Sequence, residues 1–247
     1  PEYNMIRVGE AMTRILEEAG IPVIHDTTLN DYPSYNGSYD RTRENIERYL
    51  EQYPSIQMVI DVHRDAVELL EGGQMATSAT VNGKPSAQVM LVMGTDEGGL
   101  THPNWQDNLS WALKLQVEME RQYPGLTRPM SLRPERYNQH ATPGSVLVEI
   151  GTAGDTLQRA ILASEAFAHT LVTLIQGLGL SNDILYSEMS SLTAKEKVKV
   201  LLAQALFGKP DIILLDEPTN HLDIQSREWI EEAVEEYEGN LLFVSHD

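Results

Sequence analysis

The 247-residue sequence has no cysteine, few basic residues and no long apolar run. Without cysteine, disulfides, thiolate metal sites and thiolate nucleophiles are all excluded. The 18 Lys and Arg stand against 37 Asp and Glu, a formal net charge of −19. This argues against a broad nucleic-acid or anionic-membrane surface, because phosphate binding needs clustered cations. No stretch approaches the roughly 18 apolar residues of a membrane span, so we expect no transmembrane segment.

Hydrophobic residues make up 41% of the chain, which is enough to build a core. The length allows one large domain or two small ones at about 100–200 residues per domain. The first ten residues do not have the pattern of a signal peptide. The chain begins with Pro1 rather than Met, so we expect a processed or truncated start.

Helical and strand-like apolar patterns alternate over residues 1–178. The predicted helices are 4–19, 41–53, 104–123 and 155–177, and the predicted strands are 21–25, 56–62 and 145–150. Residues 75–93 are typical of a hairpin that turns at Asn82-Gly83. The alternation predicts an α/β domain with a largely parallel sheet and flanking helices in three layers.

Residues 179–185 are typical of a linker, and residues 186–247 have a different character. Residues 181–247 hold 14 acidic and 5 basic residues, against 23 and 13 in the first 180. We expect helices at 194–207 and 225–238 and strands at 211–215 and 241–245. The tail is therefore predicted to be a second, more acidic α/β unit.

Polar residues follow three of the predicted strands in the first domain. They are His25, Asp61 with His63, and Glu149. Reactive groups collect beyond the carboxyl ends of strands in open α/β sheets. A neutral imidazole is a good zinc ligand, and a nearby carboxylate can take a proton from a zinc-bound water. The alternatives are hydrogen-bonded histidines at the sheet edge and a structural salt bridge for Glu149.

Several separated blocks of the chain resemble the stage II sporulation protein P family. The blocks read HDTTLNDYPSYNGSYDRT, VIDVHRDA, MLVMGTDEGGLTHPNW, RYNQHATPGSVLVEIG and DTL, and the resemblance covers about residues 2–178. It implies a zinc-dependent N-acetylmuramoyl-L-alanine amidase. Such an enzyme cleaves the amide between the lactyl group of muramic acid and the L-alanine of the stem peptide.

The resemblance also implies roles for individual residues. His63 matches a zinc ligand, and Glu149 matches the catalytic glutamate that activates water. The family's upstream His-Thr-His motif and nearby Glu do not occur here, which predicts an N-terminally truncated domain with an incomplete ligand set. His25 is the candidate substitute zinc ligand. Arg64 and Asp65 are expected to orient His63 and to belong to the substrate-binding residues. The alternative is that they pair with each other.

His102 and His140 lie in family blocks and are expected to line the substrate groove, or to be hydrogen-bonded loop residues. Arg133 and Arg136 are candidates for binding a stem-peptide carboxylate, since a guanidinium fork fits a carboxylate bidentately; the alternative for each is an exposed ion pair. The resemblance implies peptidoglycan stem peptides and glycan as ligands and a lytic transglycosylase as partner. It implies an extracytoplasmic or septal location.

The tail contains IILLDEPTNHLD, a hydrophobic strand that ends in Asp216 and Glu217, and SHD with His246. In this Walker B arrangement the aspartate holds Mg²⁺ and the next carboxylate polarises the attacking water. The tail resembles the C-terminal third of an F-type ATP-binding cassette protein, a cytoplasmic class associated with ribosomes. The phosphate-binding motif G-x-x-x-x-G-K-[ST] does not occur in the chain, so we expect a partial P-loop-type fragment.

The two resemblances imply different compartments, which predicts a chimera joined from two proteins. The leading function is a zinc-dependent, sporulation-associated peptidoglycan amidase. One alternative is a protein that binds and hydrolyses ATP with Mg²⁺. Another is a peptidoglycan-binding remnant that has lost catalysis.

Overall fold

The computed structural model describes residues 5–30, 32, 34, 36–69, 72–177, 212–216 and 240–244. It divides into two compact units, Pro1–Leu174 and Ile175–Asp247. The helices of the described chain are α1 (Met5–Glu18), α2 (Ser38–Gln52), α3 (Trp105–Gln122), α4 (Leu157–Gly177) and the short 3-10 helix η1 (Gln139–Ala141). The four predicted helices of the first domain are therefore confirmed, although α2 begins three residues before the predicted start at 41.

The helix α1 forms because apolar residues recur on one of its faces. Val8, Met12 and Ile15 are buried at helical spacing. The helix stops before Gly20, whose φ of 79° lies in the left-handed region. The Gly20 amide bonds back to the carbonyl of Glu17, which satisfies one of the free helix-end carbonyls.

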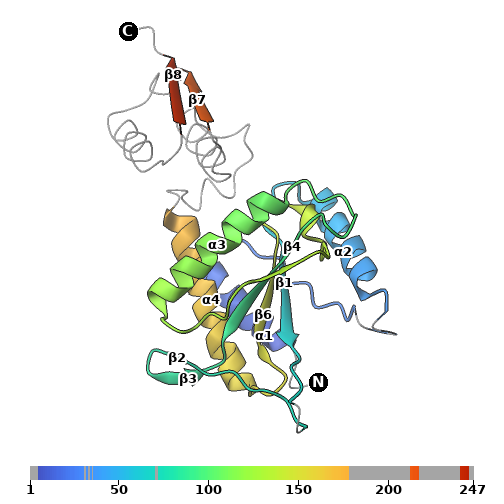
Figure 1. The fold of residues 1–247 in the computed structure, drawn as a ribbon, viewed down its shortest axis with the longest axis vertical. Coiled ribbons are helices and arrows are strands. Elements are labelled where there is room, and N and C mark those ends of the chain that lie inside the picture. Colours follow the sequence, from blue (N-terminus) through green and yellow to red (C-terminus); the bar gives the residue numbers. More distant parts are fainter. Residues whose placement is uncertain are drawn as a thin grey trace. The chain divides into compact units, whose positions relative to one another are not determined.

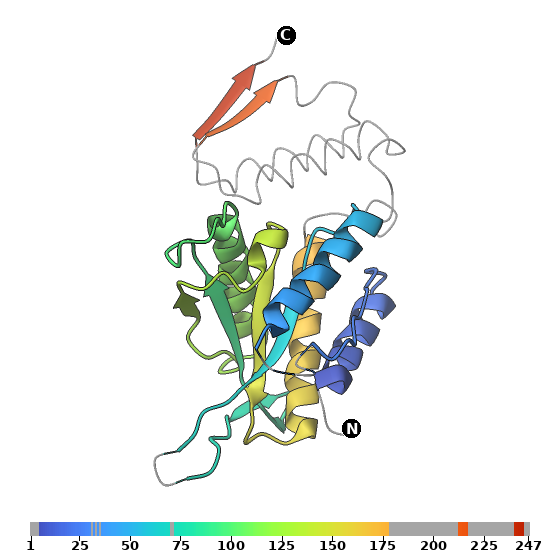
Figure 2. The same cartoon turned by 90° about the vertical axis from the view of Figure 1, so that its right-hand side faces the viewer.

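A four-stranded sheet forms the centre of the first unit, in the order β1-β6-β4-β5. The strands are β1 (Ile60–Asp65), β4 (Val89–Gly94), β5 (Ser131–Arg133) and β6 (Val146–Thr152). The β1–β6 and β4–β5 pairings are parallel, whereas β4 and β6 are antiparallel. Figures 1 and 2 show α1 and α4 side by side on one side of the sheet and α3 on the other. The prediction of a mostly parallel sheet with flanking helices is confirmed.

The structure differs from the predicted strands at several places, and β1 covers Ile60–Asp65 where the prediction ran over 56–62. Residues 21–25 are not a strand, and the short, partly exposed strand β5 was not predicted. The turn at Asn82-Gly83 is confirmed, but it joins β2 (Ala79–Val81) to β3 (Lys84–Ser86) rather than to the following apolar run. That run is β4. It lies between two other strands of the main sheet and is therefore buried almost throughout.

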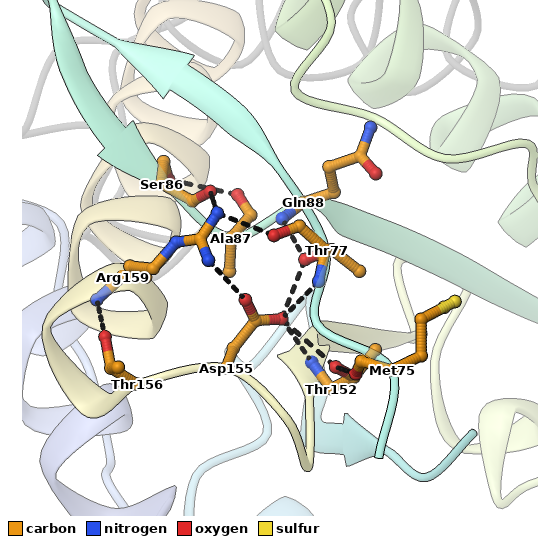
Figure 3. Close-up of polar contacts among 9 residues, drawn as sticks. All are labelled: Met75, Thr77, Ser86, Ala87, Gln88, Thr152, Asp155, Thr156 and Arg159. Carbon is orange, nitrogen blue, oxygen red and sulfur yellow. Dashed lines mark hydrogen bonds and ion pairs between the residues drawn. The ribbon is translucent and has the colours of Figure 1, made fainter. Parts of the chain in front are cut away.

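A buried carboxylate connects the hairpin region to β6 and α4 (Figure 3). The Asp155 Oδ2 atom accepts hydrogen bonds from the Thr77 amide at 3.1 Å, the Thr77 hydroxyl at 2.7 Å and the Thr152 amide at 2.9 Å. Arg159 pairs with the other carboxylate oxygen at 3.5 Å and donates to the Thr77 carbonyl at 2.6 Å. This network fixes the end of β6 three residues beyond Glu149.

The second unit contains the parallel pair β7 (Ile212–Asp216) and β8 (Asn240–Val244). The two predicted strands of the tail are confirmed, each within one residue. The predicted helices at 194–207 and 225–238 and the linker at 179–185 lie outside the described residues. The described strands alone do not establish a P-loop cassette.

Candidate active site

His63 and Glu149 are direct partners in the parallel ladder of β1 and β6. Both lie within strands rather than after them, because each strand runs beyond its apolar residues, β1 to Asp65 and β6 to Thr152. Alternation along β1 places Asp61 on the same side of the sheet as His63. The pairing thus brings an imidazole and two carboxylates onto one face of neighbouring strands.

His63 is half-buried and interacts with a carboxylate and an aromatic ring. Its Nε2 atom lies 3.0 Å from Asp61 Oδ1. The ring stacks on Tyr39, with the ring centroids 6.2 Å apart. Burial disfavours the imidazolium, but the Asp61 hydrogen bond and the charges of Asp61 and Glu149 outweigh it and raise the pKa of His63.

Glu149 has the most unusual environment in the site. Its Oε2 atom is buried and has no hydrogen-bond partner among the described residues. Burial raises the pKa of Glu149 to about 7, and the charges of Asp65 and Asp61 act in the same direction. His63 and Arg128 oppose that rise. Glu149 is therefore poised to exchange a proton near neutral pH.

An ion pair borders this face. Arg128 Nη2 lies 2.7 Å from Asp65 Oδ2, and both side chains are largely buried. Asp65 thus has Arg128 as its ion-pair partner, whereas Arg64 is exposed on the opposite side of the strand. The expectation that Arg64 and Asp65 orient His63 stays a prediction. Arg128 comes from the loop before β5, and no sequence pattern had marked it.

The described residues do not supply a full zinc site. Catalytic zinc usually takes three protein ligands. No group of three or more His, Asp and Glu that could hold a metal occurs in the described part of the chain. The expectation for His25 rested on a strand over 21–25, which does not form. His25 packs instead against Gly9 of α1, in a pocket lined by α1 side chains.

The predicted groove residues lie in two loops that contact each other. His102 is buried in the loop before α3, and His140 lies in η1. Arg136 Nη1 donates to the carbonyl of Thr101 at 2.8 Å. The charges of Arg136 and His140 both act on His102, so the structure brings the three predicted groove residues together.

Tyr39 and Tyr137 are site residues that the sequence did not indicate. Their ring centroids are 5.7 Å apart, which places Tyr137 beside the Tyr39–His63 stack. Tyr137 has a φ of 48° and Asn138 a φ of 58°, conformations that are uncommon outside glycine. Burial raises the pKa of Tyr137, and the charge of Glu149 contributes. The left-handed backbone therefore holds an aromatic ring next to the catalytic candidates.

The nucleotide-site candidates are described only in part. Asp216 is the last residue of β7, as the Walker B pattern predicts. Glu217 and His246 lie outside the described residues. The roles of these three residues stay predictions.

The C-terminal part of the chain is similar to ATP-binding proteins. A Bacillus subtilis protein described as the uncharacterized ABC transporter ATP-binding protein YkpA is 58% identical over 74 residues, which is 30% of this chain and 14% of that protein. The probable ATP-binding protein YheS of Escherichia coli is 29% identical over 199 residues, covering 74% of this chain and 29% of the relative. The chain thus spans less than a third of the length of these relatives.

One solved structure with a similar arrangement is the CwlD amidase from Clostridioides difficile in complex with the GerS lipoprotein. Its sequence is 13% identical, the TM-score is 0.46, and the match covers 70% of this chain and 85% of that one. The family model of stage II sporulation protein P (SpoIIP) matches residues 1–172, which is well over half of the chain. The matched residues include the strand partners His63 and Glu149. The chain therefore belongs to the SpoIIP family.

Proposed function

We propose that the first unit hydrolyses the amide between N-acetylmuramic acid and the L-alanine of the peptidoglycan stem peptide. Membership of the SpoIIP family supports a sporulation-associated, amidase-like role. The observation that carries the proposal is Glu149, a buried carboxylate with an unpartnered oxygen and a pKa of about 7, paired in register with His63. Such a group suits general acid–base catalysis of amide hydrolysis.

The proton transfers follow from the state of Glu149. As a carboxylate, it takes a proton from the water whose oxygen attacks the amide carbonyl carbon. As a carboxylic acid, it then gives this proton to the nitrogen of L-alanine while the carbon–nitrogen bond breaks. The products are the lactyl carboxylic acid, which loses its remaining proton at neutral pH, and the free amine, and Glu149 returns to its carboxylate state. A pKa of about 7 lets one residue perform both steps at neutral pH.

Zinc dependence is a further part of the proposal. His63 would hold the zinc ion, which would polarise the carbonyl and lower the pKa of its bound water. His63 is the imidazole on the site face, but its Nε2 atom is engaged by Asp61, and the described residues provide no group of three ligands. The residues described here therefore do not fit a complete catalytic zinc site, and the steps above involve this chain's own groups alone.

The proposed substrates are peptidoglycan stem peptides and glycan, reached on the extracytoplasmic or septal side of a membrane. We further propose that the enzyme acts with a lytic transglycosylase partner. The helices of the described chain include none long and apolar enough to cross a membrane.

The decisive variant is Glu149→Gln in the full chain, assayed for new L-alanine amino termini released from purified peptidoglycan. We expect a loss of at least about a hundredfold, the lower end of general base contributions. Glu44→Gln, an exposed change on α2, is the matched control and is expected to keep the wild-type rate. Elemental analysis after dialysis tests zinc in parallel, with His63→Ala expected to lower the bound zinc.

A stability measurement separates loss of chemistry from loss of fold. The folded-state pKa of Glu149 is raised from 4.5 to about 7, so the free energy of unfolding falls as pH rises through this window. Glu149→Gln removes the buried charge and is expected to be more stable than wild type at pH 8 and equal to it at pH 4. An inactive variant that is less stable at pH 8 would contradict the assignment. Stable, tight binding of wall fragments by wild type without turnover would favour the non-catalytic remnant.

A second candidate function, ATP binding by the second unit, rests on its own observations. Parallel β7 and β8, with Asp216 at the end of β7, agree with a Walker B strand and its neighbour. The similarity to ATP-binding proteins supports the same alternative. A rise in the unfolding midpoint with Mg-ATP, absent with Mg²⁺ alone, would favour it.

A further inference from the structure

His102 is a buried histidine whose ring lacks partners. The residue is only 2% exposed, and neither Nδ1 nor Nε2 has a hydrogen-bond partner among the described residues. An unsatisfied buried polar group destabilises the folded state, because it has given up its hydrogen bonds to water. Native proteins rarely keep such groups empty without a functional reason. The ring is therefore suited to a ligand that supplies the missing bonds.

His102 lines an open pocket of about 320 Å³, here called the His102 pocket. Its lining residues come from one loop: Asp96, Gly99, Leu100, Thr101, His102 and Pro103. Two glycines let this loop pack directly on the backbone of residues 134–136. A Cβ on Gly94 would lie 2.3 Å from the carbonyl oxygen of Glu135, and one on Gly98 would lie 2.4 Å from that of Pro134. The pocket is therefore held by backbone contacts before any ligand arrives.

The second loop places a cation and another histidine beside the loop that lines this pocket. Arg136 bonds to the carbonyl of Thr101, and the Nδ1 atom of His140 is buried with no partner in the described chain. Burial lowers the pKa of His102 to about 4, and His140 and Arg136 contribute more than the opposing charge of Asp96. At neutral pH the ring of His102 is therefore neutral, and the nearby permanent cation is Arg136.

Positive charges also lie near His140. Burial lowers its pKa, and the charges of Arg136 and Arg43 add to that effect, against the smaller opposing influence of Glu47. A neutral imidazole offers one N–H donor, and a guanidinium offers a fork of donors. Two N–H groups and a guanidinium favour an anion over a cation. A metal is disfavoured further because the described residues contain no group of three ligands.

We propose that the His102 pocket binds a carboxylate of the stem peptide through the ring N–H groups of His102 and His140 and the guanidinium of Arg136. This inference deepens the proposed amidase function and rests on it for the nature of the ligand. Arg136 directly precedes Tyr137, whose ring lies by the His63 stack, so one loop connects the pocket to the catalytic candidates. The carboxylate thereby fixes how the peptide lies against Glu149.

The test measures binding in the full chain carrying Glu149→Gln, so that hydrolysis does not interfere. The probe is N-acetylmuramoyl-L-alanyl-D-isoglutamine, which has one free carboxylate, compared with its neutral carboxamide by titration calorimetry. We expect the acid to bind at least tenfold more tightly than the amide. Arg136→Gln should abolish this preference, and Arg48→Gln, an exposed change of the same charge on α2, should keep it.

A second variant tests the unsatisfied ring directly. His102→Phe keeps a ring and removes both polar nitrogens, so it should raise the unfolding midpoint while it weakens binding of the acid. A lower midpoint with unchanged acid binding would show a structural histidine and overturn the proposal. Equal binding of acid and amide to the parent chain would overturn the pocket assignment and leave the amidase proposal standing. Binding of neither probe would overturn both.

Discussion

Glu149, the proposed catalytic residue, lies in an environment that destabilises its charged form. Its carboxylate follows an apolar run in a buried strand, where a charged group is poorly solvated. Nearby Asp61 and Asp65 add to the cost of ionising it, whereas His63 and Arg128 reduce that cost. The pKa of about 7 therefore reflects burial together with opposing charges, and replacing any one of these four charged residues should shift it.

Arg128 and Asp65 are expected to shift the pKa of Glu149 in opposite directions. Arg128→Gln removes a cation that favours the carboxylate, so the pKa of Glu149 should rise and the acidic limb of the rate profile should move to higher pH. Asp65→Asn removes a like charge, so the limb should move to lower pH. The rate at pH 6 is expected to change about twofold to tenfold, down in the first variant and up in the second.

Carbon-13 NMR titration of the glutamate carboxyl groups measures the same shifts without activity. Arg133→Gln serves as the charge-matched control and should leave the Glu149 titration unchanged. Shifts of the same sign in the Arg128 and Asp65 variants would mean that loss of their ion pair, rather than each charge, controls the site.

Helices were predictable from this sequence, and strands only in part. Apolar residues at helical spacing identify α1, α3 and α4 because long periodic patterns are specific. The strand β5 has three residues, two of them exposed, and carries no such pattern. The register that joins His63 to Glu149 depends on the pairing of distant strands, which no single strand encodes. Arg128 was missed for the same reason, since its role depends on where a loop lies.

The packing of the β4–α3 loop on residues 134–136 gives a prediction about Gly94. A Cβ there would meet the carbonyl oxygen of Glu135 and the Cα of Arg136, both backbone atoms that cannot rotate away. Gly94→Ala is expected to lower the free energy of unfolding by about 1–3 kcal/mol, the usual cost of overpacking. Urea unfolding measures the change.

Gly83→Ala is the comparison variant, since nothing lies within 4 Å of a Cβ at this hairpin position. Its φ of 76° confines the cost to backbone strain of about 1–2 kcal/mol. Gly94→Ala should also lower the affinity of the His102 pocket for the acid probe, whereas Gly83→Ala should not. Equal affinity in both variants would mean that the loop packing does not shape the pocket.

The chain as a whole combines two units with different relatives. The SpoIIP family model ends at residue 172, and the first compact unit ends at Leu174. ATP-binding relatives match the C-terminal part, and the match to YheS, over 74% of the chain, extends into the first unit as well. The first unit has its own sheet with helices on both faces, so its core does not require the second unit. This arrangement supports the proposal that the chain joins segments of two proteins.

A chain shortened after Gly177 is therefore expected to keep the unfolding transition of the first unit. Its midpoint in circular dichroism melting should lie within about 2 °C of the corresponding transition in the full chain, because a change of 1 kcal/mol moves the midpoint by about 2–4 °C in a domain of this size. Shortening after Ala163 instead removes the part of α4 that buries Phe167 and Leu171, and this chain should not fold. If the chain ending at Gly177 also failed to fold, the first unit would need the second for its stability. The proposal that the chain joins two independently folding segments would then be wrong.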